Sequence, residues 1–235
     1  DINGAAVVNA INKIIDNLAY FINKNFIYKG KSIKYQNNKV LFGNKSIDFK
    51  KLISLAHLNR ISLSSSGFYK TPKIFMNKET LKGRPFLYFA YGAAVSEVII
   101  DTLTGENKLL QVDILHDVGK SINPSIDLGQ IEGGFVQGLG WLTTEQISWN
   151  VNGNLSTYSP STYKIPVSKD IPEKFNVDIY EKGLNIEKTV NRSKAVGEPP
   201  LMLALSTFMA LKNAVNNNNL KAPATPENIL MALQE

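Results

Sequence analysis

The stretch RSKAVGEPPLMLALSTFMALKNAV (residues 192–215) places one carboxylate, Glu198, between a glycine and two prolines. Proline fixes φ near the helical value and lacks an N–H group, so Pro199 and Pro200 suit a first helical turn. The apolar residues that follow are too continuous for a surface helix and predict one buried in a large core. Glu198 therefore stands at the mouth of a buried helix, where the helix dipole stabilises an acid. The local residues favour this capping interpretation, and only the wider sequence could assign the acid another role.

A second unusual stretch, DLGQIEGGFVQGLGWLTTEQ (127–146), has the length of a helix although it is rich in glycine. Each glycine costs helix stability, so something must offset the cost. Glycines let another backbone or a bulky ligand approach closely, which leaves tight helix packing and a cofactor-facing surface as alternatives. A nucleotide-binding loop is not expected, because no G-x-G-x-x-G follows a strand and no GK[ST] occurs.

Other polar residues are assigned no chemistry. His57 and His116 are the only histidines, and His116 falls in a β-rich stretch, where a hydrogen-bonded sheet histidine is expected rather than a metal ligand. Glu97 and Asp101 are expected on the solvent side of a strand. The proline-bounded loop PSTYKIP (160–166) is expected to be structural.

The elements near the N-terminus follow from periodicity and turn residues. Residues 2–22 carry apolar side chains at helical spacing and predict an amphipathic helix. The stretch SIKYQNNKVLFG (32–43) predicts a hairpin that turns at Asn37 and Asn38. Ser46 is expected to cap the short helix that follows.

The remaining sequence predicts a larger sheet with helices. Residues 86–119 contain two β-rich runs joined at TLTGEN, which predicts a long hairpin turning at Gly105. KFNVDIY (174–180) predicts a further strand, and Thr225 with Pro226 marks the start of a last helix. Together these elements indicate an α+β fold with mixed sheets and packed helices.

The composition is that of a soluble globular chain. Of 235 residues 43% are hydrophobic, and no run approaches the roughly 18–20 apolar residues of a membrane span. The start DINGAAVVNA has no basic leader, so the cytoplasm is the expected compartment. The lack of cysteine excludes disulfides, thiol catalysis and a cysteine-held zinc or iron–sulfur site within this sequence. The net charge of +6 comes from lysines scattered through Asn-rich segments, so nucleic acid is not an expected partner.

Five stretches, in this order and spacing, resemble the molybdenum-binding large subunit of bacterial xanthine dehydrogenases, in the xanthine oxidase and aldehyde oxidase family of molybdenum hydroxylases. They are SSSGFYKTPKI, YFAYGAAVSEVIIDTLTGE, DILHDVGKSINPSIDLGQIEGGFVQGLGWLTTE, SPSTYKIP and RSKAVGEPPLMLALSTFMALKNAV. The resemblance covers essentially all of residues 1–235 and implies the C-terminal part of one molybdenum cofactor-binding domain. The chain is therefore expected to be a fragment without the upstream loops for molybdopterin and substrate.

The resemblance also implies roles for three residues. Glu198 matches the family's general base, which takes a proton from a molybdenum-bound hydroxide while a hydride passes to a sulfido ligand of the metal. Gln130 matches a glutamine that hydrogen-bonds an oxygen ligand of molybdenum. Gly197 is expected beside Gln130, as a second cofactor-binding residue that contributes its backbone. The dithiolene of the pterin holds the metal in this family, so no protein metal ligand is expected. The apolar helix behind Glu198 is expected to bury it partly, which would raise its pKa.

The implied activity is oxidation of xanthine and hypoxanthine to urate in an assembled enzyme. Electrons would leave through iron–sulfur clusters and FAD in a small subunit or another domain, and the rest of the large subunit is a second expected partner. Two alternatives stay open: an aldehyde oxidase-type hydroxylase, because the GEPP glutamate is shared across the family, and a structural or assembly module that is inactive alone. Neither nucleic acid nor a membrane is expected as a partner.

Overall fold

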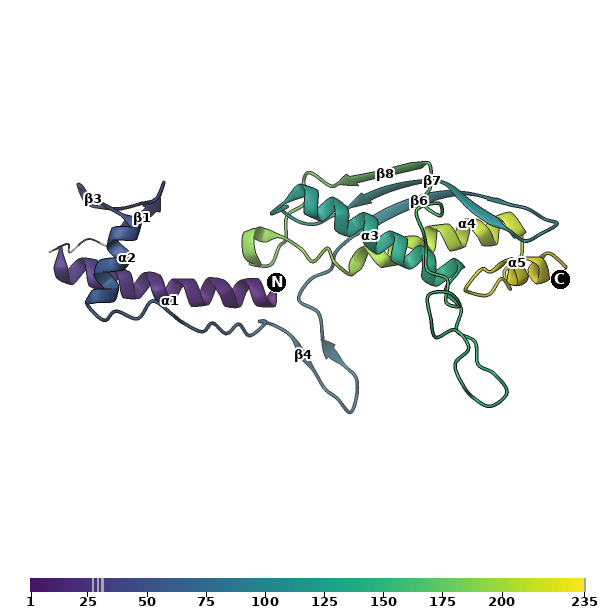
Figure 1. Cartoon of the computed structure of the whole chain (residues 1–235), viewed down its shortest axis with the longest axis horizontal. Helices are drawn as coiled ribbons and strands as arrows, with labels where there is room; N and C mark the ends of the chain where they lie inside the picture. The colour runs from purple at the N-terminus through teal and green to yellow at the C-terminus, as the bar shows by residue number, and fades with distance from the viewer. Residues whose placement is uncertain (27, 29, 31, 235) are drawn as a thin grey trace. The chain divides into compact units, whose positions relative to one another are not determined.

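The computed structural model describes residues 1–26, 28, 30 and 32–234. Contacts divide the chain into two compact units, Asp1–Leu87 and Tyr88–Glu235 (Figure 1). Both units combine helices with small sheets, which confirms the predicted α+β class. That residues 1–235 form part of a single cofactor-binding domain stays a prediction.

The first unit holds two helices, a three-stranded antiparallel sheet and a two-stranded ribbon. Strand β1 turns into β2 at Asn37 and Asn38, whose φ angles are 49° and 57°. Asparagine tolerates these left-handed angles, so the predicted hairpin is confirmed. The elements are α1 (Ile2–Asn25), β1 (Ile33–Gln36), β2 (Lys39–Phe42), β3 (Lys45–Asp48), α2 (Phe49–Leu58), β4 (Phe75–Met76) and β5 (Gly83–Arg84). The core consists of Leu18, Phe21, Ile22, Val40, Phe42, Leu52 and Ala56.

The cap of α2 differs from the prediction. Ser46 lies inside β3, opposite Leu41 of β2, and the N-cap residue is Asp48. The Asp48 side chain accepts a hydrogen bond of 3.1 Å from the backbone N–H of Lys51. Because pairing with β2 extends the strand as far as Asp48, the helix starts later than expected, and a carboxylate does the capping that was assigned to a hydroxyl.

A non-helical segment, residues 61–69, lies along α1 (Figure 1). Three α1 side chains, spaced by four residues and therefore on one face of the helix, donate hydrogen bonds to its carbonyl oxygens. The pairs are Asn9 with Phe68 (2.7 Å), Lys13 with Ser66 (2.9 Å) and Asn17 with Ser62 (3.0 Å). The approach is closest at Gly67, where a β-carbon would overlap the carbonyl oxygen of Ala6. The segment thus depends on a residue without a side chain.

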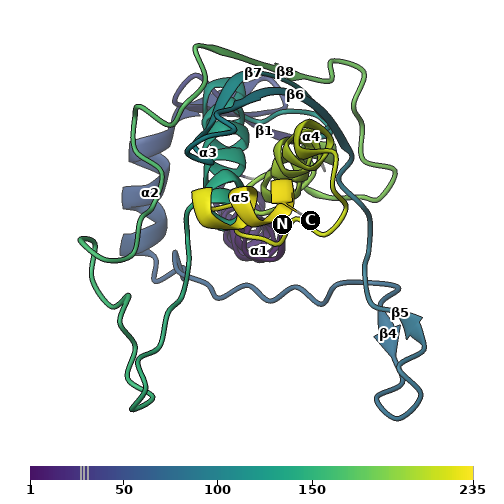
Figure 2. The ribbon, with the colours of Figure 1, turned by 90° about the vertical axis from the view of Figure 1, so that its right-hand side faces the viewer.

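The second unit is a three-stranded sheet with helices on one face. The strand order is β6-β7-β8, with β6 antiparallel and β8 parallel to β7. Viewed end on, α3 and α4 lie side by side under the sheet (Figure 2). Its elements are β6 (Gly92–Ile100), β7 (Asn107–His116), α3 (Pro124–Thr143), β8 (Lys174–Ile179), the 3-10 helices η1 (Val190–Arg192) and η2 (Pro199–Ala204), α4 (Leu205–Val215) and α5 (Pro226–Gln234).

The predicted long hairpin, glycine-rich helix, third strand and last helix are all present. Gly105 has a φ of 75° and makes the turn of the hairpin, where glycine carries no steric penalty. The hydroxyl of Thr225 accepts a hydrogen bond of 3.3 Å from the backbone N–H of Asn228, as expected of an N-cap. The main core between sheet and helices consists of Leu109, Val112, Ile114, Val118, Ile131, Phe135, Leu139, Leu142 and Ala204.

The apolar run 201–215 is not buried throughout, contrary to the prediction. It begins as η2 and continues as α4, and Ala204, Leu211 and Val215 are buried. Met202 of η2 and Met209 of α4 are 52% and 59% exposed, because η2 packs mainly on α3 and α4 mainly on β6, each with one face. Across the described residues, no helix combines the length and apolar character that crossing a bilayer requires.

Candidate functional site

The glycines of α3 fall into two groups. A β-carbon on Gly134 would stand 3.1 Å from Cβ of Pro200 and 3.4 Å from the backbone nitrogen of Leu201, and one on Gly138 would overlap the carbonyl oxygen of Leu201. Gly134 and Gly138 are buried, so η2 rests on the backbone of α3 at these positions. Tight packing, one of the two alternatives, is therefore the role of this pair.

Gly129 and Gly133, in contrast, are exposed, and a β-carbon at either position would meet no atom within 4 Å. They lie four residues apart and thus share a face of α3. This face leaves room for a bulky group to approach the helix backbone. The second alternative, a cofactor-facing glycine surface, stays a prediction for these two residues.

Glu198 is the N-cap residue of η2, and Pro199 and Pro200 lie in its first turn, as the sequence predicted. Its carboxylate makes no side-chain capping hydrogen bond, so the capping contact that the local residues favoured is not made. The side chain is exposed, which contradicts the expected partial burial within these 235 residues. Since η2 is short and begins at the surface, the apolar residues behind Glu198 do not cover it.

Gln130 and Gly197 lie together. A β-carbon on Gly197 would stand 3.4 Å from Oε1 of Gln130, so the amide reaches the residue directly before Glu198. Gln130 is exposed on the first half of α3, and its amide offers both a donor and an acceptor. The fold thus brings Gln130, Gly197 and Glu198 to one place, although 67 residues separate Gln130 from Gly197 in the sequence.

The chain that leads to Glu198 is fixed by a buried ion pair that sequence reasoning missed. Nζ of Lys194 lies 2.5 Å from Oδ2 of Asp117, and the two side chains are only 7% and 15% exposed. Nζ also lies 4.9 Å from the centre of the Tyr91 ring, within the range of a cation–π contact. Nothing in the local sequence pairs two residues 77 positions apart.

His116, the last residue of β7, is 1% exposed, and neither ring nitrogen has a hydrogen-bond partner among the described residues. The expectation of a hydrogen-bonded sheet histidine is therefore wrong. Burial lowers the pKa of the imidazole, the charge of Asp117 opposes that shift, and the charge of Lys194 adds to it. The net effect is a pKa below the usual value of a histidine, which favours the neutral imidazole.

Glu97 lies on β6, and the Asp101 carboxylate accepts hydrogen bonds from the backbone N–H groups of Leu103 and Thr104 in the hairpin turn. His57, Glu97 and Asp101 are exposed. Within the described part of the chain, no three His, Asp or Glu side chains gather as metal ligands would.

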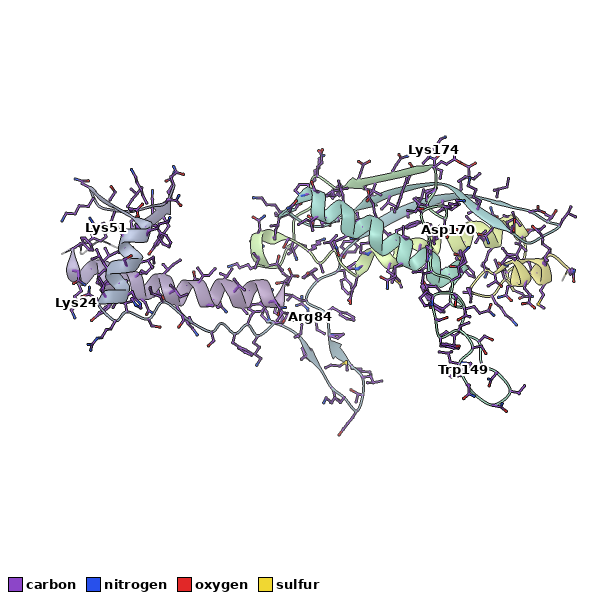
Figure 3. All side chains as sticks on the ribbon, viewed as in Figure 1. Lys24, Lys51, Arg84, Trp149, Asp170 and Lys174 are labelled. Atoms are coloured by element: carbon purple, nitrogen blue, oxygen red, sulfur yellow. The ribbon has the colours of Figure 1, made fainter. Side chains whose placement is uncertain are left out.

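The loop after α3 is held by its own polar contacts. Tyr163 donates a hydrogen bond of 2.6 Å to Glu145, and Lys164 lies 3.7 Å from Asp170. These contacts fit the structural role expected for PSTYKIP. The loop projects from the C-terminal end of α3 and carries Trp149, which is 64% exposed (Figure 3).

Residues 1–172 match the molybdopterin cofactor-binding domain, and the chain belongs to this family. The match includes Gln130 and ends before Gly197 and Glu198. The resemblance seen in the sequence is thereby confirmed, as is molybdopterin as the cofactor; a bacterial source stays a prediction.

The relatives include xanthine dehydrogenase/oxidase of Felis catus, 44% identical over 97% of this chain and 17% of that protein. Xanthine dehydrogenase of Dictyostelium discoideum is 40% identical over 97% of this chain and 16% of that protein. The chain thus spans less than a fifth of the length of these relatives.

Solved structures share the fold. A Cu,Mo-CO dehydrogenase superposes with a TM-score of 0.75 at 20% identity, over 99% of this chain and 29% of that one. The aldehyde oxidoreductase of Desulfovibrio gigas gives a TM-score of 0.64 at 24% identity, over 77% of this chain and 20% of that one. The predicted fold of a molybdopterin-binding domain is confirmed.

Proposed function

We propose that this chain is part of a molybdenum hydroxylase that oxidises xanthine and hypoxanthine to urate. The observation that carries the proposal is the position of Glu198: an exposed carboxylate at the start of η2, without a capping hydrogen bond, next to Gly197 and Gln130. The relatives named xanthine dehydrogenase, 40–44% identical over 97% of the chain, support the choice of substrate.

The residues fit a pterin-held metal. The open face at Gly129 and Gly133 admits a large group, and Gly197 presents only backbone beside the Gln130 amide. Gln130 would hold the cofactor by hydrogen bonding, and Gly197 would let it approach the chain. When bound, the molybdenum cofactor supplies the oxygen that is transferred and accepts two electrons.

Glu198 is the proton acceptor in this proposal. Replacing a ring C–H of a purine by C–OH, with oxygen that derives from water, releases two electrons and two protons. A carboxylate beside the reacting groups can take one of these protons during the reaction. Pro199 and Pro200 restrict the backbone that carries Glu198, which lowers the entropy cost of holding the base in place.

The two electrons must leave through groups that this chain does not supply. We assign them to iron–sulfur clusters and FAD in a small subunit or another domain, and the further cofactor and substrate contacts to the rest of the large subunit. An aldehyde substrate is the alternative within the same chemistry, because Glu198 would serve either reaction equally.

The deciding experiment is Glu198→Gln in the complete, assembled enzyme. The amide keeps the shape of the side chain and cannot accept the proton, so xanthine turnover should fall by about 100-fold to 10,000-fold. Molybdenum content and melting temperature should stay near those of the wild type. Glu97→Gln, at an exposed carboxylate on β6, is the matched control and should keep full turnover. A metal-loaded Glu198→Gln enzyme with normal turnover would remove Glu198 from the mechanism, and faster turnover of an aldehyde than of xanthine by the wild type would favour the alternative substrate.

A further inference from the structure

The segment that leads to Glu198 is hydrogen-bonded to the loop after β7. The backbone N–H of Lys194 donates to the carbonyl of Val118 (2.7 Å), and that of Lys120 donates to the carbonyl of Arg192 (3.1 Å). An antiparallel bridge joins Gly119 and Ser193 between these two bonds. The segment that leads to Glu198 thus starts from a short ladder of backbone hydrogen bonds rather than from an unpaired loop.

The ion pair between the side chains of Asp117 and Lys194 adds a side-chain contact to this ladder. Oδ2 of Asp117 meets Nζ of Lys194, and Oδ1 accepts a hydrogen bond of 2.8 Å from the backbone N–H of Gly119. The backbone N–H of Asp117 donates to the carbonyl of Tyr91 (2.8 Å), which ties the pair to the start of β6. Because both charges are almost fully buried, loss of either partner would leave the other uncompensated. Lys194 is therefore held both by its backbone hydrogen bond to Val118 and by its ion pair with Asp117.

Only a few residues separate this anchor from the next fixed point. The backbone N–H of Ala195 donates a hydrogen bond of 2.9 Å to the hydroxyl of Tyr88, and Val196 packs against the main core. Beyond Glu198, Pro200 and Leu201 rest on the glycines of α3. Glu198 thus lies in a short stretch between Val196, packed on the main core, and Pro200, packed on α3, and this stretch continues directly from the residue anchored by the ion pair, Lys194.

We infer that the Asp117–Lys194 pair is the positioning device for Glu198, an inference that rests on the function proposed above. Lys194 is four residues from Glu198 and acts on it through the backbone, so it is a positioning residue and not a catalytic one. A base must stand within hydrogen-bond reach of the proton it accepts, and a displacement of about 1 Å can cost about 100-fold in rate. Loss of the pair should therefore lower turnover even in enzyme that remains folded and metal-loaded.

The test uses the assembled enzyme with Lys194→Met, and with Lys108→Met as the matched control. Lys108 also forms an ion pair, 3.0 Å from Glu173, but there the side chains are 52% and 83% exposed, so its loss should change little. We expect Lys194→Met to lower kcat by about 10-fold to 100-fold, to leave KM within about 2-fold, and to retain molybdenum. Lys194→Arg, which keeps the charge, should recover part of the loss.

A cycle with Glu198→Gln separates positioning from a general loss of structure. If Lys194 acts through Glu198, Lys194→Met should lower the residual turnover of the Glu198→Gln enzyme by less than about 2-fold. An equal loss with and without Glu198 would overturn the inference while leaving the proposed function intact. Normal turnover in Glu198→Gln alone would instead remove Glu198 from the proposed mechanism, and the inference with it.

A second variant covers the case in which Lys194→Met does not assemble. The double substitution Asp117→Asn with Lys194→Gln removes both charges and keeps two polar side chains, so no unpaired charge is buried. This enzyme should fold and take up molybdenum with kcat reduced by about 10-fold or more, because amides cannot reproduce the ion pair. Wild-type kcat in this variant would overturn the inference.

Discussion

The carbonyl oxygen of Leu201 lies where a β-carbon on Gly138 would have to stand. One turn earlier, a β-carbon on Gly134 would contact Pro200. The segment η2 therefore packs directly on the backbone of two consecutive turns of α3. The glycine-rich helix therefore tolerates its poor helix propensity because a neighbouring backbone occupies the space that side chains would fill.

Gly134→Leu should destabilise the protein by about 1–3 kcal/mol or more, because a large side chain must displace η2. In the assembled enzyme, η2 would also shift Glu198, so molybdenum content or turnover should fall as well. The measurements are melting temperature and elemental analysis.

The matched control is the adjacent Gly133→Ala, at a position where a β-carbon meets nothing. It should leave the melting temperature unchanged or raise it, because alanine favours the helix by roughly 1 kcal/mol over glycine. Equal melting temperatures for Gly134→Leu and the wild type would mean that η2 does not rest on α3.

Gly67→Ala should loosen the segment that lies along α1. The new methyl group would overlap the Ala6 carbonyl, so the hydrogen bonds from Asn9 and Lys13 to the segment should weaken. Faster amide hydrogen exchange in residues 61–69 and in the first half of α1 would report the change. Ser64→Ala, at an exposed position in the same segment, should leave exchange as in the wild type.

His116 should make stability depend on pH in a defined direction. In the unfolded chain a histidine has a pKa of about 6.5, whereas burial lowers the pKa of His116 in the fold. Between these two values the unfolded chain binds more protons than the folded chain, so stability is complete above about pH 6.5 and is lost as the pH falls toward the folded pKa. His116→Met, of similar volume and without a titrating group, should reduce the fall in melting temperature between pH 7 and pH 5.

The control is His57→Gln, at the other histidine, with melting temperature again measured at pH 7 and pH 5. The difference between the two variants is the part of the pH dependence that belongs to the buried imidazole. An unchanged pH dependence in His116→Met would mean that the ring is not held neutral by burial.

This chain, purified alone, should bind no molybdopterin and form no urate from xanthine. It covers 17% of the length of a relative such as the Felis catus protein, and Glu198 is exposed in it. Elemental analysis and a urate assay against buffer are the measurements. Stoichiometric molybdenum in the isolated chain would show that the residues at hand suffice for the cofactor.

Much of the fold could be predicted because its signals are local. Apolar spacing gave α1, Asn37 and Asn38 gave the first hairpin, and Gly105 gave the turn of the second. The cap of α2 was misassigned because Ser46 and Asp48 are both good caps, and only the length of the β2–β3 pairing decides between them.

The site was only partly predictable for a different reason. Glu198 and Gln130 were identified through family resemblance, and their proximity depends on how η2 meets α3. The Asp117–Lys194 pair leaves no local signal, since an aspartate and a lysine 77 residues apart are common in any sequence. Burial of the run 201–215 was overestimated because apolar residues identify a contact face without saying what covers it.

The parallel pairing of β7 with β8 has a kinetic consequence. The β6–β7 hairpin closes over residues 101–106, whereas β8 reaches β7 only after residues 117–173, which include all of α3. Contacts between distant residues form more slowly, because the entropy of the intervening chain is lost before they add stability. Since η2 docks on α3 from still further along the chain, Glu198 should be among the last groups of its unit to reach its place. A folding intermediate with a complete β6–β7 hairpin and a formed α3 would then have two of the three strands of the sheet but lack the site.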